Sequence, residues 1–285
     1  MDGLLIVDKP PGPTSHDVVH QLKRLLKTKT GHTGTLDPLA AGVLCVLIGR
    51  ATRLAQFFQG EDKEYLAEVR LGIATDTYDL EGRVTDEKPV PELSRAQLEG
   101  VLAKFRGRIS QRAPRYSAVK VQGRKLYELA RQEIEITPPE RTVEIHTLEL
   151  LEHGPRSLRL RVTCSAGTYI RSLAHDIGQE LGCGAHLASL VRTRAGAFDR
   201  SQAVPLERVA VHAGESLIPL EQLLLDMPRL DLDDLTATRV RHGNHFAPET
   251  PLCSVHYRLF HRDRLIAIGR SLGGLIHPQV VLDPA

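Results

Sequence analysis

A turn rich in glycine and small residues, between positions 31 and 44, constrains this chain more than any other feature of its sequence. It isolates one carboxylate, that of Asp37, among glycines, threonines and alanines. Glycine allows backbone conformations that are closed to other residues and lets a bulky substrate come close. The apolar octapeptide that follows, Val43 to Arg50, predicts a buried strand behind the turn. Asp37 is therefore a candidate reacting group presented on a rigid support.

The competing interpretation of Asp37 is purely structural. An aspartate followed by a proline is typical of a helix N-cap and first helical residue, which predicts a short helix beginning at Pro38. Capping accounts for Asp37 but leaves His32 and the flanking glycines unexplained.

Hydrophobic periodicity predicts both strands and helices in the rest of the chain. Lys63 to Gly72 alternates in polarity, which predicts a strand with Tyr65 on its inward face. Thr168 to Leu181 has apolar residues at helical spacing, which places Tyr169 and Arg171 in the first turn of a helix. Other predicted strands are Gly3 to Val7, Thr142 to Leu151, Ser157 to Cys164, Leu252 to Phe260 and Leu265 to Ile268. Other predicted helices are Ala51 to Gln59, Ser94 to Phe105, Leu126 to Gln132, Ile218 to Leu225 and one capped by Thr14 or Ser15.

Composition and missing motifs exclude several classes of protein. A chain of 285 residues with 41% hydrophobic residues is long enough for one sizeable core and a smaller satellite domain. Its apolar runs are too short to cross a bilayer and no leader is evident, so a cytoplasmic protein without a membrane partner is expected. The four cysteines form no Cys-x-x-Cys pair, and the signatures of phosphate loops, dinucleotide sites, zinc proteases and serine esterases are absent. The histidines form no cluster with metal-ligand spacing, and Asp76 and Asp79 read as a self-capping loop rather than a magnesium site.

Positive charge is concentrated in one stretch, although the net charge is only +2. Between Lys104 and Lys125 there are eight cations and no carboxylate, and aromatic residues are interleaved with them. A second basic cluster, Lys23 to Lys29, precedes the glycine turn. Such clusters bind a nucleic-acid backbone by releasing condensed counterions, although each alone is equally consistent with a solvated face.

Several motifs together resemble the TruB family of tRNA pseudouridine synthases. The glycine turn and the Asp8–Asp17 segment, which reads Asp-Lys-Pro-Pro-Gly-Pro-Thr-Ser-His-Asp, match that family closely. Further matches, in family order over roughly residues 3 to 200, are Lys63–Tyr65, Thr75–Asp79, Tyr116–Lys120, Cys164–Arg171, Gly184–Leu187 and Arg192–Phe198. Each motif is weak alone, but their joint occurrence is highly specific.

The resemblance implies a role for each matching residue. Asp37 matches the catalytic aspartate, Tyr65 the tyrosine that stacks on the target base, and Arg171 the arginine paired with that aspartate. Without the resemblance, Tyr65 reads as a core residue and Arg171 as a surface cation. The implied substrate-binding residues are His32, Lys9, Tyr169 and Leu190, together with Arg115 and Lys120 from the basic stretch, which is expected to clamp the RNA.

The family's reaction suits a site with one ionised carboxylate and no cofactor or metal. Uridine 55 in the T loop of tRNA is flipped out, its bond from C1′ to N1 is broken, and the uracil is rejoined through C5. The carboxylate either adds to C1′, as glycosidase nucleophiles do, or removes a proton from C2′ to give a glycal. Arg171 would fix the orientation of Asp37, and Tyr65 offers a phenol near C5, where a proton must leave.

The resemblance also implies an architecture. The expected fold is α+β, with a mixed, mainly antiparallel sheet flanked by helices in residues 1–228 and a basic insertion at about 104–140. Residues 229–285 are expected to form a small β-rich, PUA-like RNA-binding domain. The expected partner is the tRNA T stem-loop, and the protein is expected to be a monomer that needs no guide RNA. The alternatives are a non-catalytic tRNA-binding protein or RNA chaperone, and the guide-RNA-dependent branch of the family.

Overall fold

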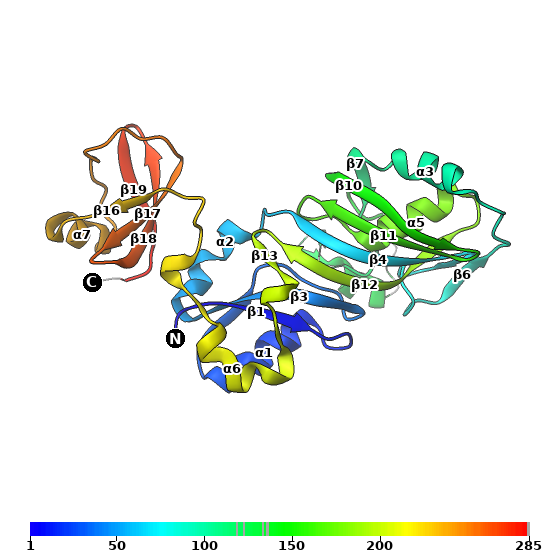
Figure 1. Cartoon of the computed structure of the whole chain (residues 1–285), viewed down its shortest axis with the longest axis horizontal. Helices are drawn as coiled ribbons and strands as arrows, with labels where there is room; N and C mark the ends of the chain where they lie inside the picture. Colours follow the sequence, from blue (N-terminus) through cyan, green and yellow to red (C-terminus); the bar gives the residue numbers. More distant parts are fainter. Residues whose placement is uncertain (118, 122, 133, 135–136, 284–285) are drawn as a thin grey trace.

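A mixed sheet of 11 strands forms the centre of the computed structural model, which describes residues 1–117, 119–121, 123–132, 134 and 137–283 (Figure 1). Its main path runs β14 (Val204–Pro205), β1 (Gly3–Lys9), β3 (Ala40–Ile48), β12 (Ala185–Ala195), β4 (Lys63–Leu71), β11 (Ser157–Cys164), β10 (Glu140–Gly154) and β7 (Gly107–Arg112). Three short strands pair with it off this path: β2 (Thr30–His32), β13 (Phe198–Asp199) and β15 (Ile218–Pro219). Most neighbours are antiparallel, but β3 with β12 and β1 with β14 are parallel pairs. The sheet is thus mixed and mainly antiparallel.

Helices cover one face of this sheet and enclose the largest hydrophobic core. They are α1 (Ser15–Leu26), α3 (Arg95–Ala103), α5 (Ile170–Glu180) and α6 (Val209–Ser216). Helix α1 begins after Thr14, whose side chain accepts a hydrogen bond from the backbone of Asp17 while Asp17 caps Thr14 in return. Its apolar residues Val18 and Leu22 are fully buried, which fixes α1 beside the glycine turn.

Strands β1 and β3 are buried on two faces and strand β4 on one, and their patterns of apolar residues differ accordingly. Strands β1 and β3 are covered on both faces: Leu5 and Leu44 face the helices, whereas Leu4 and Val43 face a second core. This is why β3 reads as a continuous apolar run, as a strand with two buried faces must. Strand β4 is buried on one face only and alternates in polarity.

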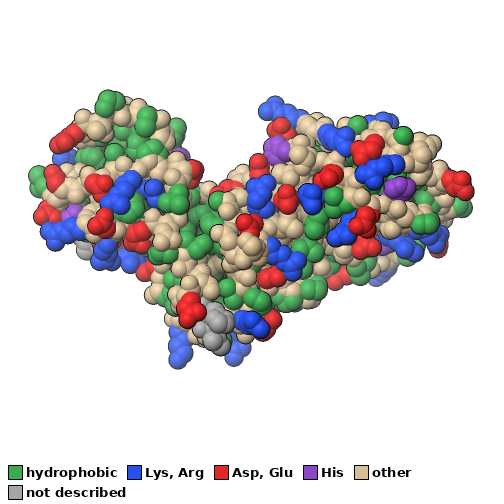
Figure 2. All heavy atoms as spheres, viewed as in Figure 1, with side chains coloured by type: hydrophobic (Ala, Val, Ile, Leu, Met, Phe, Trp, Pro, Cys, Tyr) green, Lys and Arg blue, Asp and Glu red, His purple; other side chains and the backbone are tan. Residues whose placement is uncertain are grey.

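The C-terminal segment forms a separate four-stranded sheet with one helix. Its elements are β16 (Arg229–Asp231), α7 (Asp234–Arg241), β17 (His256–His261), β18 (Arg264–Leu272) and β19 (Leu275–Val281). Figure 2 shows it as a lobe separated from the body by a notch, with charges of both signs interspersed on this face. Apolar residues of this sheet share a core with the segment after β3, which forms η1 (Gly49–Leu54) and α2 (Ala55–Phe58).

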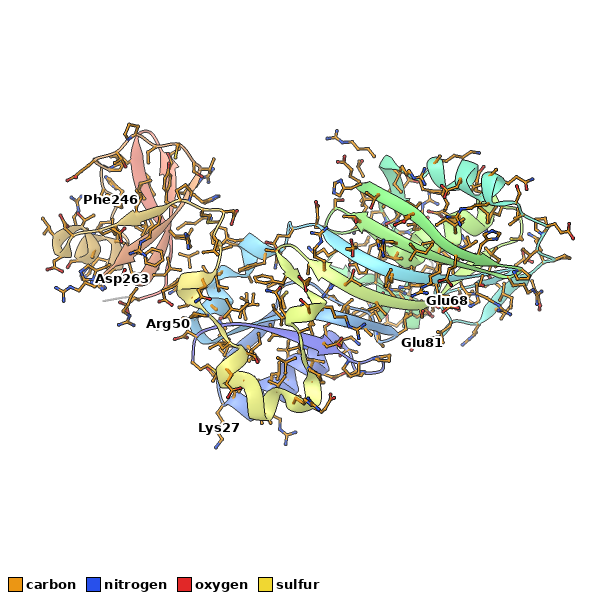
Figure 3. The ribbon with its side chains drawn as sticks, in the orientation of Figure 1. Lys27, Arg50, Glu68, Glu81, Phe246 and Asp263 are labelled. Atoms are coloured by element: carbon orange, nitrogen blue, oxygen red, sulfur yellow. The ribbon has the colours of Figure 1, made fainter. Side chains whose placement is uncertain are left out.

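Polar contacts reinforce this junction. Arg50, labelled in Figure 3, forms an ion pair with Asp2 at 3.0 Å and reaches Asp283 at 3.4 Å. The ring of Phe57 meets His256 edge-on, with centroids 5.4 Å apart. The C-terminal sheet is therefore packed on the segment that directly follows β3.

The remaining elements are short: β5 (Ile73–Thr75), β6 (Val84–Glu87), β8 (Lys120–Val121), β9 (Arg124–Lys125), α4 (Leu126–Arg131), η2 (Arg200–Gln202), η3 (Leu206–Arg208) and η4 (Leu220–Gln222). Within the described part of the chain, no helix has the length and apolarity that a bilayer crossing requires.

Most predicted elements are confirmed, but two predicted helices, at Pro38 and at 218–225, are wrong. No helix begins at Pro38, because the backbone N–H of Ala40 bonds the Asp37 carbonyl in a β-turn that enters β3 directly. The predicted helix over 51–59 is present, divided between the end of the 3₁₀ helix η1 and the short α-helix α2. Segment 218–225 contains a two-residue strand and one 3₁₀ turn rather than an α-helix; Leu220, Leu223 and Leu224 are buried at helix-like spacing without forming one. The central strand β12 was not among the predicted strands.

Candidate active site

The loop that carries Asp37 connects β2 to β3 and is held at several points. The hydroxyl of Ser15, the first residue of α1, donates to the Leu36 carbonyl at 3.0 Å and accepts from the Leu36 N–H at 2.7 Å. The N–H of Gly12 donates to the Pro38 carbonyl at 2.8 Å. Because both neighbours of Asp37 are tied to other elements, the carboxylate is presented in one orientation.

Lys9 lies behind this loop rather than on its open side. Its side chain is fully buried, and its ammonium donates to the carbonyls of Pro10, Pro13 and Pro38 at 2.8, 2.7 and 3.3 Å. Burial lowers the pKa of Lys9 to about 8, and the nearby Asp37 carboxylate opposes that change. The ammonium thus supports the loop from within the protein.

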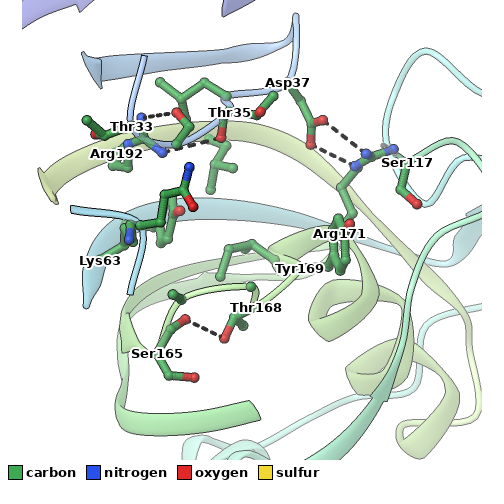
Figure 4. Close-up of a pocket in the computed structure, with 18 residues that line it drawn as sticks. Thr33, Thr35, Asp37, Lys63, Ser117, Ser165, Thr168, Tyr169, Arg171 and Arg192 are labelled. Carbon is green, nitrogen blue, oxygen red and sulfur yellow. Dashed lines mark hydrogen bonds and ion pairs between the residues drawn. The ribbon is translucent and has the colours of Figure 1, made fainter. Parts of the chain in front are cut away.

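Arg171 holds the Asp37 carboxylate from the opposite side of the site, as the dashed lines in Figure 4 show. Its Nη2 donates to Oδ1 at 3.0 Å, and its Nε lies 2.9 Å from Oδ2, an ion pair in which the N–H is not well aligned for a hydrogen bond. The Arg171 side chain is 5% exposed, whereas that of Asp37 is 31% exposed. The arginine is therefore anchored inside the protein while the carboxylate faces the cavities.

A second carboxylate, that of Asp79, shares the same guanidinium. Nη1 of Arg171 lies 3.2 Å from Asp79 Oδ2, and the side chain of Asp79 is 5% exposed. The other carboxylate oxygen of Asp79 accepts from the Thr77 hydroxyl at 2.6 Å and the Glu81 N–H at 3.1 Å. Sequence reasoning treated Asp79 as a self-capping loop residue. The structure gives it a further partner, the arginine that holds Asp37.

Two cavities meet at Asp37 and Arg171. The smaller, of about 230 Å³, is lined by Tyr65, Leu190 and Tyr169. The larger, of about 850 Å³, is lined by His32, Tyr116 and the start of α1. Burial raises the pKa of Tyr65, and the Arg192 guanidinium opposes that change, so the phenol is protonated at neutral pH.

Two residues predicted to contact the substrate, Tyr169 and His32, lie at these cavities. Tyr169 is the N-cap residue of α5, and the buried amide of Gln111 holds its backbone: Gln111 Nε2 donates to the Tyr169 carbonyl at 2.9 Å, and the Tyr169 N–H donates to Gln111 Oε1 at 2.7 Å. His32 has a buried Nδ1 without a hydrogen-bond partner, and burial lowers its pKa. Ser117, which sequence reasoning missed, lines both cavities with a buried, unpartnered hydroxyl.

The basic stretch carries less free charge than its sequence indicates. Four of its cations form ion pairs with carboxylates from outside the stretch: Lys104 with Glu180, Arg106 with Glu99, Arg108 with Glu144 and Arg112 with Glu140. Arg115 is exposed and has no acidic partner among the described side chains. Lys120 begins the short strand β8, but its side chain lies outside the described part of the structure. Nor do the described residues include a group of three histidines, cysteines or carboxylates arranged to hold a metal.

The comparisons with known proteins agree with this geometry. A model of the TruB family pseudouridylate synthase N-terminal domain matches residues 23–170, and one of the tRNA pseudouridylate synthase B C-terminal domain matches residues 171–230. A protein of Solibacter usitatus named tRNA pseudouridine synthase B is 44% identical over 99% of this chain and all of its own length. One of the same name from Symbiobacterium thermophilum is 50% identical over 85% of this chain and 82% of its own.

Solved structures extend the likeness to the fold. A chain from a Cbf5-Nop10-Gar1 complex superposes with a TM-score of 0.75 and is 29% identical, covering 99% of this chain and 85% of its own. A chain from an H/ACA RNP bound to a substrate RNA containing 2′-deoxyuridine gives a TM-score of 0.74 at 28% identity, with the same coverage. This chain therefore belongs to the TruB family of pseudouridylate synthases.

Proposed function

We propose that this chain is an isomerase that converts uridine 55 in the T loop of tRNA to pseudouridine, with Asp37 as the catalytic carboxylate. The observation that carries the proposal is the paired geometry of Asp37 and Arg171, in which the carboxylate is held by two guanidinium nitrogens and still opens onto two cavities. The name tRNA pseudouridine synthase B, shared by relatives that align with nearly the whole chain, supports the same substrate.

The isomerisation of uridine to pseudouridine needs few catalytic groups from the protein beyond this carboxylate. The bond from C1′ to N1 breaks, the freed uracil turns, C1′ bonds to C5, the C5 proton leaves and N1 gains one. Asp37 acts on the ribose, either by adding to C1′ or by removing the C2′ proton. Both routes need a carboxylate that is fixed in direction and unobstructed on its substrate side, and the contacts of Asp37 meet this need.

The walls of the smaller cavity suit a single flipped base. Its volume of about 230 Å³ lies below the roughly 300–1,000 Å³ of pockets for drug-sized ligands. We propose that Tyr65 stacks on the base there, against Leu190, and that Tyr169 lines its entrance. His32, Arg115 and Lys120 bind the surrounding RNA, and Lys9 acts on the substrate through the loop that it supports.

The identities favour a stand-alone enzyme over a guide-dependent one. The curated relatives named for tRNA are up to 50% identical to this chain, whereas the chains from the H/ACA RNP and Cbf5 complexes are 28–29% identical. We propose a cytoplasmic monomer that binds the T stem-loop without a guide RNA. Its catalytic domain is residues 1–228, and residues 229–285 form a PUA-like RNA-binding domain.

One experiment tests the function directly. Unmodified tRNA is incubated with wild type, with Asp37→Asn and with the control Asp17→Asn, whose carboxylate is exposed on α1. Pseudouridine is then mapped along the RNA, and tRNA binding is measured separately. We expect wild type and Asp17→Asn to modify uridine 55, and Asp37→Asn to bind tRNA without modifying it. Full activity of Asp37→Asn would refute the role of the carboxylate, and modification elsewhere would refute the substrate.

A further inference from the structure

Arg192 is a buried arginine that none of the proposed roles uses. It lies in β12, between β3 and β4, and is 2% exposed. Its guanidinium donates three hydrogen bonds to backbone carbonyls: Nε to Val43 at 2.7 Å, Nη2 to Gly34 at 3.1 Å and Nη1 to Thr35 at 3.3 Å. Figure 4 shows it across the cavity from Arg171.

These three carbonyls bracket the catalytic aspartate in the chain. Gly34 and Thr35 precede Asp37, and Val43 follows it in β3, so one side chain ties both limbs of the loop to β12. The main chain of Arg192 is equally close to this segment: a Cβ on Gly42, whose φ is +98°, would lie 2.2 Å from the Arg192 carbonyl oxygen. A rigid, planar set of donors holds these positions together in a way that a flexible point charge does not.

No fold requirement accounts for an arginine at this position. Among the described residues, no carboxylate lies within ion-pair distance of Arg192, so its buried charge is compensated by the three carbonyl dipoles and by the neighbouring Tyr65 phenol. Burying a charge is unfavourable unless its contacts are well directed, and an apolar side chain in the middle of a sheet avoids that penalty. What the buried guanidinium stabilises is the conformation of the Asp37 loop.

We propose that Arg192 is a positioning residue for the reaction: its guanidinium holds Gly34 and Thr35 of the Asp37 loop to Val43 of β3, so that the Asp37 carboxylate meets the ribose in the reactive direction. The proposal rests on the proposed function of Asp37. It predicts a defect in turnover rather than in RNA affinity, because Arg192 acts on the loop and its donors face protein carbonyls. A displacement of about 1 Å in a reacting group can lower a rate roughly 100-fold.

The test compares Arg192→Met and Arg192→Lys with the control Arg194→Met. Arg194 lies two residues along the same strand, and its guanidinium bonds the carbonyl of Gly196, outside the loop. For each variant we measure the dissociation constant for unmodified tRNA, the single-turnover rate at saturating enzyme, and the thermal unfolding midpoint.

We expect Arg192→Met to unfold cooperatively above the assay temperature, to bind tRNA within about threefold of wild type, and to react roughly 100-fold more slowly. Arg192→Lys restores the charge on a single ammonium nitrogen without the planar fork, and should recover about tenfold of the lost rate. Arg194→Met should match wild type in rate and affinity.

Other results would overturn the proposal. A folded Arg192→Met that reacts at the wild-type rate refutes it, and so does a loss confined to affinity, which would make Arg192 an RNA-binding residue. If Arg192→Met does not fold, the proposal is judged on Arg192→Lys, and a wild-type rate for that variant refutes it. If neither variant folds, the guanidinium is needed for folding and the proposal fails. Absence of pseudouridine with the wild type would refute the proposed function itself, which separates the two failures.

Discussion

Replacing Arg171 by lysine tests how much of the reaction depends on the two-point contact with Asp37. The guanidinium faces Asp37 through Nε and Nη2, Asp79 through Nη1, and the carbonyls of Thr77 and Tyr116 at 3.2 and 3.0 Å. A lysine ammonium is a point charge on a flexible stem, so it can satisfy one of the two carboxylates at a time. Arg171→Lys therefore keeps the positive charge beside Asp37 but no longer fixes the orientation of the Asp37 carboxylate.

The size of the effect follows from these contacts. A hydrogen bond to a charged group contributes about 1.5–3 kcal/mol, so losing the Nη2 hydrogen bond to Asp37 together with the adjoining Nε ion pair should raise the barrier by about 3–4 kcal/mol. At about 1.4 kcal/mol per tenfold change, the rate should fall by roughly 10²–10³. Because a cation remains between the two carboxylates, tRNA affinity should stay within about threefold of wild type.

The assay uses tRNA labelled with tritium at the C5 position of uridine, because this hydrogen leaves when C5 bonds to C1′. Tritium release is followed under single-turnover conditions with enzyme in excess. Arg161→Lys is the matched control, since Arg161 forms one exposed ion pair with Glu149 at 3.0 Å on the solvent face of β11, opposite to the buried face that Tyr65 shares. A wild-type rate for Arg171→Lys would refute the argument that the planar guanidinium of Arg171 orients the Asp37 carboxylate.

Two further predictions concern stability and are checked by denaturant unfolding. Gly42→Ala places a Cβ 2.2 Å from a backbone oxygen at a positive φ and should cost about 3 kcal/mol or more, whereas Gly31→Ala, with open space around it, should change stability by less than about 0.5 kcal/mol. Equal effects would contradict the close approach of β3 and β12. Burial raises the pKa of Asp176 to about 6 against the opposing charge of Arg112, so the folded state loses stability as pH rises from about 4 to 6. Asp176→Asn should therefore be neutral at about pH 4 and stabilising at about pH 7.5, by about 1 kcal/mol after allowing for its partial exposure; the opposite pH trend would contradict this sign.

Local patterns in the sequence were sufficient for the elements that surround the site. The apolar run of β3, the capped helix α1 and the alternating strand β4 each express their burial within a few consecutive residues. The isolation of Asp37 in a glycine turn pointed to the reacting group for the same reason. In each case the signal and the structure that it specifies occupy the same short segment.

Contacts between residues far apart in the chain left no comparable signal in the sequence. Strand β12 has two irregularities in its pairing with β4, after Leu187 and after Arg192, which interrupt its alternation. Contacts such as Gln111 with Tyr169 and Asp79 with Arg171 join residues 58 and 92 positions apart. The carboxylates that pair with four of the eight cations in the basic stretch also come from other elements. Charge counted along the chain therefore overestimated the free charge on the surface.

The position of β12 explains why the site is rigid. Asp37 belongs to the half of the sheet that contains β3, whereas Arg171 lies in the first turn of α5, the helix that follows β11 in the other half. Strand β12 is hydrogen-bonded to both halves, and its residue Leu190 pairs with Ala40 on one side and Ala67 on the other. Any relative movement of the halves would break this pairing. Because the protein cannot readily move Asp37 to the ribose, the RNA has to bring its uridine out of the loop, and the cost of unstacking must be offset by contacts in the two cavities.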